Sequence, residues 1–273
     1  MKIGYLGPEG TFSEMALLSY CEHKTAEKVA FATIPDAIWA VYGQKVQEAV
    51  VPVENSLEGT VYITLDLLAH EVELLIKGEI VIPVRQALLS REPVRLAEVA
   101  YIYSHPQGIG QCMQFIRQNM PQAEIKYTNS TSEGAKIAAE TPRSVAIGTV
   151  RAAELYGLQV LSAGIQDNSD NCTRFLVLGR EDHPPTGNDK TSLIIAVPDT
   201  PGSLYTMLGE FARRGINMQK IESRPSRKIL GEYIFFIDVN GHRQEAALAA
   251  AINSMRAKSY YVKMLGSYPR FRL

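Results

Sequence analysis

Cysteine is scarce in this sequence, and no closely spaced set of metal-binding residues occurs. The three cysteines, Cys21, Cys112 and Cys172, lie far apart and include no Cys-x-x-Cys motif, so neither a disulfide framework nor a zinc cluster is indicated. None of the five histidines forms a His-x-x-x-His pair. We therefore expect reduced thiols and no metal site.

Long apolar runs and an excess of basic charge are also missing. No stretch approaches the roughly 18 apolar residues of a membrane span, and the start, MKIGYLGPEG, lacks the long apolar core of a signal peptide. The 28 Lys and Arg residues are balanced by 29 Asp and Glu residues, so no basic surface is available to neutralise a phosphate backbone. We expect a cytoplasmic protein that binds neither membranes nor nucleic acid.

The length and composition are typical of a two-domain globular protein. The chain has 273 residues, of which 46% are hydrophobic and 21% charged, and an average domain has roughly 150 residues. Residues 180–190, REDHPPTGNDK, combine charge, prolines and turn formers without apolar periodicity. This composition predicts a linker between two domains.

Before that linker, short apolar runs alternate with longer amphipathic ones. The apolar runs predict strands and the amphipathic segments predict helices, which indicates an α/β domain. Most predicted strands are apolar on both faces, as parallel strands covered by helices are, and ligands bind such sheets at the carboxyl ends of the strands. The predicted strands are 2–6, 48–53, 99–104 and 144–147, and the predicted helices are 12–20, 61–70, 110–119 and 152–155.

After the linker, the predicted elements follow the order βαββαβ, which is typical of a ferredoxin-like sandwich. A Gly-containing hairpin through Leu230 and Gly231 joins the two central strands. Such a module has little internal cavity and more often binds and pairs than catalyses. The predicted strands are 191–198, 216–223, 233–241 and 260–268, and the predicted helices are 204–215 and 243–258.

Four polar segments border the predicted strands of the first domain. In GPEGTFSE, Thr11 and Glu14 have the spacing of a capping box at a helix start, where free amides can hold an anion. Each segment alone is also compatible with an ordinary turn or cap. The turns near residues 7, 55, 104, 131 and 173 all follow or precede predicted strands, so we expect them to converge on one cavity. The four segments are 7–14, 51–60, 103–111 and 167–175.

The order of five motifs resembles that of prephenate dehydratases. They are GPEGTFSE, VPVENSLEGTV, YSHPQ, the Ser130-Thr131 pair in NSTSEGA, and NCTRFLVLG, whose Thr-Arg-Phe is that family's hallmark. The part after the linker resembles the ACT regulatory domain of the same enzymes, through residues 201–204 and 220–225. One departure is Gly202-Ser203-Leu204, where the family commonly has Gly-Ala-Leu. Because no helical chorismate mutase segment precedes residue 1, we expect the monofunctional form.

The resemblance implies a catalytic domain of two α/β lobes, arranged like a periplasmic binding protein, with the site in the cleft between them. The lobes would be roughly 1–79 plus 166–183, and 80–165, so that the catalytic domain is 1–183. Residues 190–273 would form the ACT domain. Because the α/β pattern is complete before the linker, we expect a chain ending near residue 183 to keep its fold.

The resemblance also implies the reaction, which is the decarboxylating dehydration of prephenate to phenylpyruvate in phenylalanine biosynthesis, without a metal or organic cofactor. Thr173 would donate to the leaving hydroxyl, with Arg174 and Glu54 as the other catalytic residues. A further set of polar and aromatic residues would bind the substrate. These are Thr11, Asn55, Ser56, Ser104, Gln107, Gln111, Thr131 and Phe175.

Phenylalanine would inhibit by binding the ACT domain, and such domains usually pair, so a homodimer or homotetramer is expected. Two alternatives stay open at this point: arogenate dehydratase, which uses the amino analogue of prephenate, and a non-catalytic two-lobed sensor of small acids. The expected effector-binding residues are Gly202, Ser203, Leu204, Glu222, Ser223, Arg224 and Pro225.

Overall fold

The computed structural model describes residues 1–227 and 232–271. The chain divides into two compact units. One unit comprises Met1–Ala37, Val50–Tyr62 and Ile80–Phe175, and the other comprises Ile38–Ala49, Ile63–Glu79 and Leu176–Leu273. The expected hairpin through Leu230 and Gly231 lies outside the described residues. Within the described part of the chain, no helix has the length and apolar character needed to cross a bilayer.

The first sheet has the strand order β2-β1-β3-β11-β5, with the short β4 paired to the end of β3. β1 and β2 are parallel, whereas β3 and β4 are antiparallel. The strands are β1 (Lys2–Leu6), β2 (Glu27–Phe31), β3 (Glu48–Asn55), β4 (Gly59–Thr60), β5 (Leu75–Pro83) and β11 (Cys172–Gly179). The helices in this part of the chain are α1 (Phe12–Tyr20), α2 (Ile34–Tyr42) and α3 (Tyr62–His70).

The second sheet has the order β10-β6-β9-β7-β8 and mixes strand directions. β7 is parallel to both β8 and β9, but β6 is antiparallel to β9 and β10, so the expectation of parallel strands is only partly met. The strands are β6 (Ala87–Ser90), β7 (Tyr101–Ser104), β8 (Glu124–Tyr127), β9 (Ser144–Gly148) and β10 (Gln159–Ala163). The helices are the 3-10 turn η1 (Leu96–Glu98), α4 (Pro106–Gly110), α5 (Met113–Asn119), α6 (Thr131–Glu140) and α7 (Val150–Tyr156).

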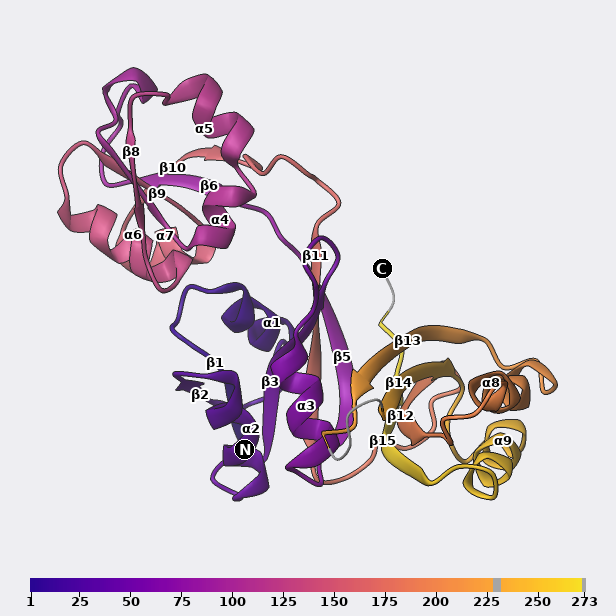
Figure 1. The fold of residues 1–273 in the computed structure, drawn as a ribbon. Helices are drawn as coiled ribbons and strands as arrows, with labels where there is room; N and C mark the ends of the chain where they lie inside the picture. Colours follow the sequence, from indigo (N-terminus) through magenta and orange to yellow (C-terminus); the bar gives the residue numbers. More distant parts are fainter. Residues whose placement is uncertain (228–231, 272–273) are drawn as a thin grey trace. The chain divides into compact units, whose positions relative to one another are not determined.

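Helices cover both faces of this second sheet, as Figure 1 shows for α5 on one side and α6 and α7 on the other. Ile109, Cys112 and Ile116 build one core against the sheet. Small residues such as Ala135 and Ala152 build the other, which allows α6 and α7 to approach closely. In place of one helix at 110–119, α4 ends at Gly110 and α5 begins at Met113, because the backbone leaves the helical conformation at Cys112.

The C-terminal part has the expected βαββαβ order and the sheet order β13-β14-β12-β15 of a ferredoxin-like sandwich. All of its described strand pairs are antiparallel. Both helices pack on one face, where Phe211 and Met255 meet Leu193 and Ile237. The elements are β12 (Asp189–Ala196), α8 (Ser203–Ala212), β13 (Met218–Pro225), β14 (Tyr233–Asn240), α9 (Ala246–Arg256) and β15 (Tyr261–Pro269).

Within the second unit, residues 63–79 pack against the ferredoxin-like sandwich through buried contacts. Lys190 Nζ lies 2.7 Å from Glu79 Oε2, with both side chains more than nine-tenths buried. At Gly266, which has φ of 134°, a Cβ would lie only 2.4 Å from the Ile76 carbonyl oxygen. Removing the sandwich would leave the Glu79 carboxylate without its cation. We therefore no longer expect a chain ending near residue 183 to keep its fold.

Candidate active site

The first compact unit contains a cavity of about 900 Å³, a volume in the usual range of small-molecule sites. Its wall is built by the ends of β1 and β3, by the start of β11 and by the starts of α1, α4 and α6. The turns near residues 7, 55, 105, 131 and 173 all reach it. Of the residues that the sequence suggested for catalysis or substrate binding, those in the cavity wall are Thr11, Asn55, Gln107, Gln111, Thr131, Thr173 and Phe175.

The side chains of Asn55 and Thr173 form a pair in this wall. Asn55 Nδ2 donates to Thr173 Oγ1 over 2.9 Å. Two backbone N–H groups, of Leu57 and Glu58, donate to Asn55 Oδ1 at 3.0 Å each. Because these two donors belong to the backbone, they determine which end of the Asn55 amide is the oxygen.

This arrangement also determines the direction of the hydrogen bond at Thr173. Asn55 Nδ2 can only donate, so the Thr173 oxygen accepts and its own proton remains available. Asn55 also donates to Asn171 Oδ1 over 2.9 Å, and its side chain is 6% exposed. The Thr173 hydroxyl is therefore held by a buried network and can donate into the cavity.

Arg174 and Glu54 do not line the cavity. Thr173 and Phe175 face it from β11, so the alternation of side chains along a strand directs the intervening Arg174 away. Arg174 Nη1 lies 3.5 Å from Glu54 Oε2. The two residues form an ion pair between β11 and β3 beside the Asn55–Thr173 pair.

Ser56 and Ser104 also lie outside the cavity wall. Ser56 Oγ accepts from Cys172 N over 2.9 Å and thus ties the turn after β3 to the start of β11. Ser104 is fully buried, and its hydroxyl donates to the Ile147 carbonyl oxygen over 2.7 Å. A Cβ at Gly108 would lie 2.7 Å from Ser104 Oγ, so Ser104 supports the wall from behind Gly108.

The N-termini of α1 and α6 face the cavity and favour negative charge there. The N-cap of α1 is Thr11, whose Oγ1 accepts from Glu14 N over 3.3 Å, as the capping box predicts. The N-cap of α6 is Ser130, whose Oγ accepts from Glu133 N over 3.0 Å. Lys136 of α6 also lines the cavity and adds a cation to its wall.

The loop before α1 packs directly on α6 and α7. Thr149 Oγ1 donates to the Gly10 carbonyl oxygen over 2.6 Å, and Ser132 Oγ donates to the Glu9 carbonyl oxygen. Gly10 has φ of 82°, and a Cβ there would lie 2.7 Å from Ser132 Oγ. This loop needs glycine for both conformation and space. Below it, burial and the nearby Glu14 and Glu9 raise the pKa of Tyr5 to about 12.

Sequence reasoning did not select several residues of the cavity wall as site residues. Ser130 and Glu133 are spaced as a capping box and could have revealed α6, with Lys136 one turn beyond. His105 caps α4 through Nδ1, which accepts from Gln107 N over 3.2 Å. Gln86 lies in the wall without any local motif, so only the fold reveals it.

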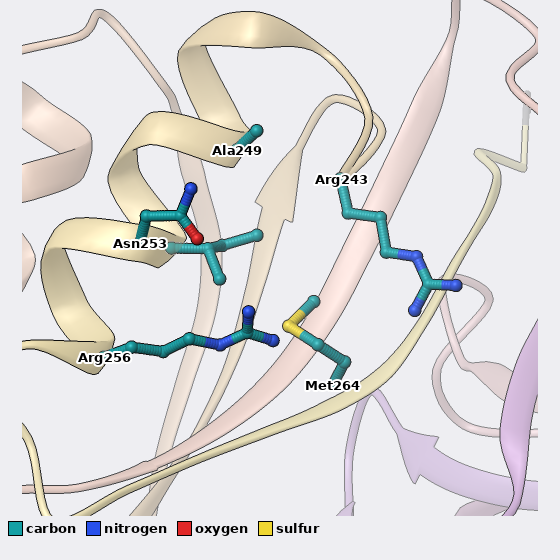
Figure 2. A pocket seen from close by; sticks show the side chains of 6 residues that line it. Arg243, Ala249, Asn253, Arg256 and Met264 are labelled. Atoms are coloured by element: carbon teal, nitrogen blue, oxygen red, sulfur yellow. The ribbon is translucent and has the colours of Figure 1, made fainter.

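Two further cavities lie in the described structure. One, of about 380 Å³, adjoins the first and shares Gln107 and Gln111 with it. The other, of about 240 Å³, lies in the second unit between α9 and β15, where Figure 2 shows Arg243 and Arg256 directed toward the hollow. None of the expected effector-binding residues lines this third cavity.

Most of the expected effector-binding residues lie on the surface of the ferredoxin-like sandwich. Gly202 is the N-cap of α8 with φ of 83°, and nothing lies within 4 Å of the place its Cβ would take. Leu204 packs against the core under α8. Arg224 donates through both Nε and Nη2 to Asp66 of α3, over 2.8 to 3.1 Å. Ser203, Glu222, Ser223 and Pro225 are partly or fully exposed.

Comparison with known proteins identifies the two parts of the chain. Residues 3–183 match the family model of prephenate dehydratase, and residues 191–257 match that of the ACT domain. The chain is 40% identical to the bifunctional chorismate mutase/prephenate dehydratase of Aquifex aeolicus over 270 residues, which cover 99% of this chain and 74% of that protein. It is 38% identical to the prephenate dehydratase of Bacillus subtilis, with both chains covered completely.

A solved structure shares the fold of nearly the whole chain. The crystal structure of prephenate dehydratase from Arthrobacter aurescens in complex with L-Phe superposes with a TM-score of 0.90 at 35% identity, covering 99% of this chain and 90% of that one. The expected mixed α/β catalytic part and the C-terminal ACT domain are thereby confirmed. The chain belongs to the prephenate dehydratase family of carbon–oxygen lyases.

Proposed function

We propose that this lyase converts prephenate to phenylpyruvate in the cavity of about 900 Å³, with Thr173 as the donor to the leaving hydroxyl. The observation that carries the proposal is the 2.9 Å hydrogen bond from Asn55 Nδ2 to Thr173 Oγ1 in the cavity wall. It leaves the Thr173 proton for a group in the cavity.

The reaction needs one proton and no redox partner. The bond between the ring and its carboxylate breaks and releases CO₂, and its electron pair forms a new ring double bond. An existing ring double bond then shifts toward the carbon that carries the hydroxyl, which departs with a proton as water. Thr173 is a weak acid, so it assists through a short hydrogen bond as the charge on the departing oxygen develops. Aromatisation of the ring supplies the driving force.

The two carboxylates of the substrate fit the electrostatics of the wall. The N-termini of α1 and α6 present backbone amides and partial positive charge, and Lys136 contributes a full charge. Gln107, Gln111 and Thr131 add polar contacts. We assign Arg174 and Glu54 a positioning role, since their ion pair joins β11 to β3 beside Thr173 without lining the cavity.

The activity is tested by incubating the purified full-length protein with prephenate and following the absorbance of phenylpyruvate in alkali. The expected result is a linear rise that depends on enzyme concentration. A flat trace, together with calorimetric binding of prephenate, would contradict the catalytic proposal and favour the small-acid sensor.

Feedback inhibition by phenylalanine is expected to depend on the open space beside Gly202. Gly202→Asn tolerates the positive φ but fills part of the space near the helix start, where free amides suit the carboxylate of an amino acid. We expect the half-inhibitory concentration of phenylalanine to rise by about 10-fold or more, because typical coupling corresponds to 5- to 150-fold in affinity. The uninhibited kcat should stay within about twofold, because the variant changes only the effector site.

Gly187→Asn is the matched control for this variant. Gly187 also has φ of 83°, and nothing lies within 4 Å of its Cβ position, but it precedes β12 rather than α8. Its inhibition curve should match that of the wild type. A Gly202→Asn protein that binds and responds to phenylalanine normally would remove this segment as the effector site.

The ion pair between Asp66 and Arg224 is expected to couple the effector segment to α3. Asp66 also accepts from Arg227 Nη2 over 2.6 Å, and its side chain is 10% exposed. α3 follows directly in the chain after the turn that carries Asn55. Asp66→Asn removes the charge and should raise the half-inhibitory phenylalanine concentration by about 5- to 50-fold, with kcat nearly unchanged.

This prediction is checked by inhibition curves recorded beside melting temperatures. Lys2→Met is the control. It removes an ion pair with Glu27 in which the two side chains are 50% and 61% exposed, and exposed pairs of this kind contribute little to stability. If Asp66→Asn folds with a normal melting temperature and retains wild-type inhibition, the ion pair is structural and carries no coupling.

We also propose a homodimer or homotetramer in the cytoplasm. Apolar side chains are exposed on the edge strand β13 and on its neighbour β14, with Ile221 of β13 41% and Tyr233 of β14 49% accessible, which suits a second copy of the chain. The described cysteines are all free thiols, and burial raises the pKa of Cys112 to about 12. Unpaired cysteines fit a reducing compartment.

A further inference from the structure

Gln86 lies in the chain between β5 and β6, and hydrogen bonds hold its backbone. Its N–H donates to Gln166 Oε1 over 3.0 Å. Its carbonyl oxygen accepts from Gly164 N over 2.9 Å and from Ile165 N over 3.1 Å. The residue is 2% exposed. The Gln86 backbone is therefore held through both its N–H and its carbonyl group, and its side chain lies in the cavity wall.

The Gln86 side chain donates to the side chain of Gln111. Gln86 Nε2 lies 3.1 Å from Gln111 Oε1. The Gln111 backbone is held as well, because its N–H donates to the Gln107 carbonyl oxygen over 3.0 Å and its carbonyl oxygen accepts from Asp167 N over 2.7 Å. With Oε1 engaged by Gln86, the Gln111 amide has its Nε2 left for the cavity.

An unsatisfied oxygen accompanies this arrangement. Gln86 Oε1 is buried and has no hydrogen-bond partner among the described residues. A buried acceptor without a donor costs about 1–3 kcal/mol, and such a cost in a native fold calls for an explanation. The same amide directs its Nε2 to Gln111 Oε1, so this cost accompanies the orientation in which Gln111 Nε2 is not engaged by Gln86.

We propose that the Gln86–Gln111 pair selects a keto-acid substrate over its amino-acid analogue. This inference rests on the proposed function of the same cavity. The pyruvyl side chain of prephenate offers oxygen acceptors, which the Gln111 N–H groups can donate to. Arogenate carries an ammonium in place of the keto oxygen, so the Gln111 N–H directed toward that position meets a donor instead of an acceptor.

The expected preference follows from the energetics of unpaired polar groups. A site built to hydrogen-bond one substrate group rejects an analogue that leaves the site's polar atoms unpaired. The wild-type protein should therefore have a kcat/KM for prephenate at least about 10-fold higher than for arogenate. Gln86 is a positioning residue in this scheme, since it acts through Gln111.

Gln86→Glu tests the orientation directly. A carboxylate cannot donate to Gln111 Oε1, so it will accept from Gln111 Nε2 and turn the Gln111 oxygen toward the cavity. The ratio of kcat/KM for prephenate to that for arogenate should fall by about 10-fold or more. Gln86→Met, which is similar in length but has no amide, should lower the same ratio by a smaller factor because Gln111 is then free to rotate.

Gln166→Leu is the matched control, because it removes one backbone contact of Gln86 but keeps the two hydrogen bonds to the Gln86 carbonyl oxygen and the contact between the Gln86 and Gln111 side chains. Gln166 lies in the wall of the adjoining cavity of about 380 Å³. Its substrate ratio should remain within about threefold of the wild type. General damage to the wall would lower both kcat/KM values together and leave the ratio in place, which a merely structural role of Gln86 predicts.

The outcomes separate this inference from the proposed function. If the wild type turns over prephenate but Gln86→Glu keeps the wild-type ratio, the selection by this pair is overturned and the proposed function stands. Equal kcat/KM values of the wild type for prephenate and arogenate would also overturn the selection by this pair and leave the proposed function standing. If the wild type turns over neither substrate, the proposed function and this inference both fail.

Discussion

Replacement of Thr173 by alanine is expected to lower kcat for prephenate by about 10²- to 10⁴-fold, the usual scale of lost proton assistance. KM should change much less, because the hydroxyl acts on the leaving group and Phe175, Gln107 and the N-termini of α1 and α6 remain in the wall. Steady-state kinetics with prephenate measures both constants.

Two further variants at residue 173 distinguish the hydroxyl from the shape of the side chain. Thr173→Ser keeps the oxygen that accepts from Asn55 and should retain much of kcat. Thr173→Val keeps the shape without the oxygen and should behave like the alanine variant. If Thr173→Val had near-normal kcat, the hydroxyl could not be the donor.

Asn55→Ala is expected to lower kcat by about 10²-fold, because Thr173 then loses the bond that directs its proton, and small misplacements of reacting groups have effects of this size. The variant also removes the bonds of Asn55 to Asn171 and to the N–H groups of Leu57 and Glu58. A lower melting temperature should accompany the kinetic loss.

Ser56→Ala separates damage to the turn from loss of the Thr173 contact. Ser56 contacts the same loop through Cys172 N but does not reach Thr173. Its kcat should fall by less than about fivefold, because the neutral hydrogen bonds that its hydroxyl makes with Cys172 N and Asn171 Oδ1 lie outside the wall of the cavity of about 900 Å³. Equal losses in the Ser56 and Asn55 variants would show that the turn, rather than the Asn55–Thr173 bond, is what matters.

Local patterns predicted α1, α3 and the turns of the cavity wall well, but they did not indicate α2 or α6. The capping box at Thr11 and Glu14 marks the start of α1, whose bounds, Phe12–Tyr20, coincide with the amphipathic segment. The βαββαβ order after residue 189 also followed from periodicity alone. These features depend on neighbours within a few residues, which is the information that one sequence carries most directly.

Non-local features were beyond the reach of these patterns. Asn55 and Thr173 are 118 residues apart, so their hydrogen bond appears only when β3 and β11 meet in one sheet. Gln86 belongs to no motif. The mixed strand directions of the second sheet depend on long connections, which periodicity does not report. Of these features, only the direction of the Arg174 side chain could be predicted from the sequence, because side chains alternate along a strand.

The central claim is that Asn55 acts by holding the Thr173 hydroxyl that assists departure of the leaving group. A double-mutant cycle of Asn55→Ala and Thr173→Ala, with kcat for prephenate measured for all four proteins, tests it most directly. Strong non-additivity is expected, with kcat of the double variant within about threefold of that of Thr173→Ala. A double variant whose loss equals the product of the two single losses would contradict it.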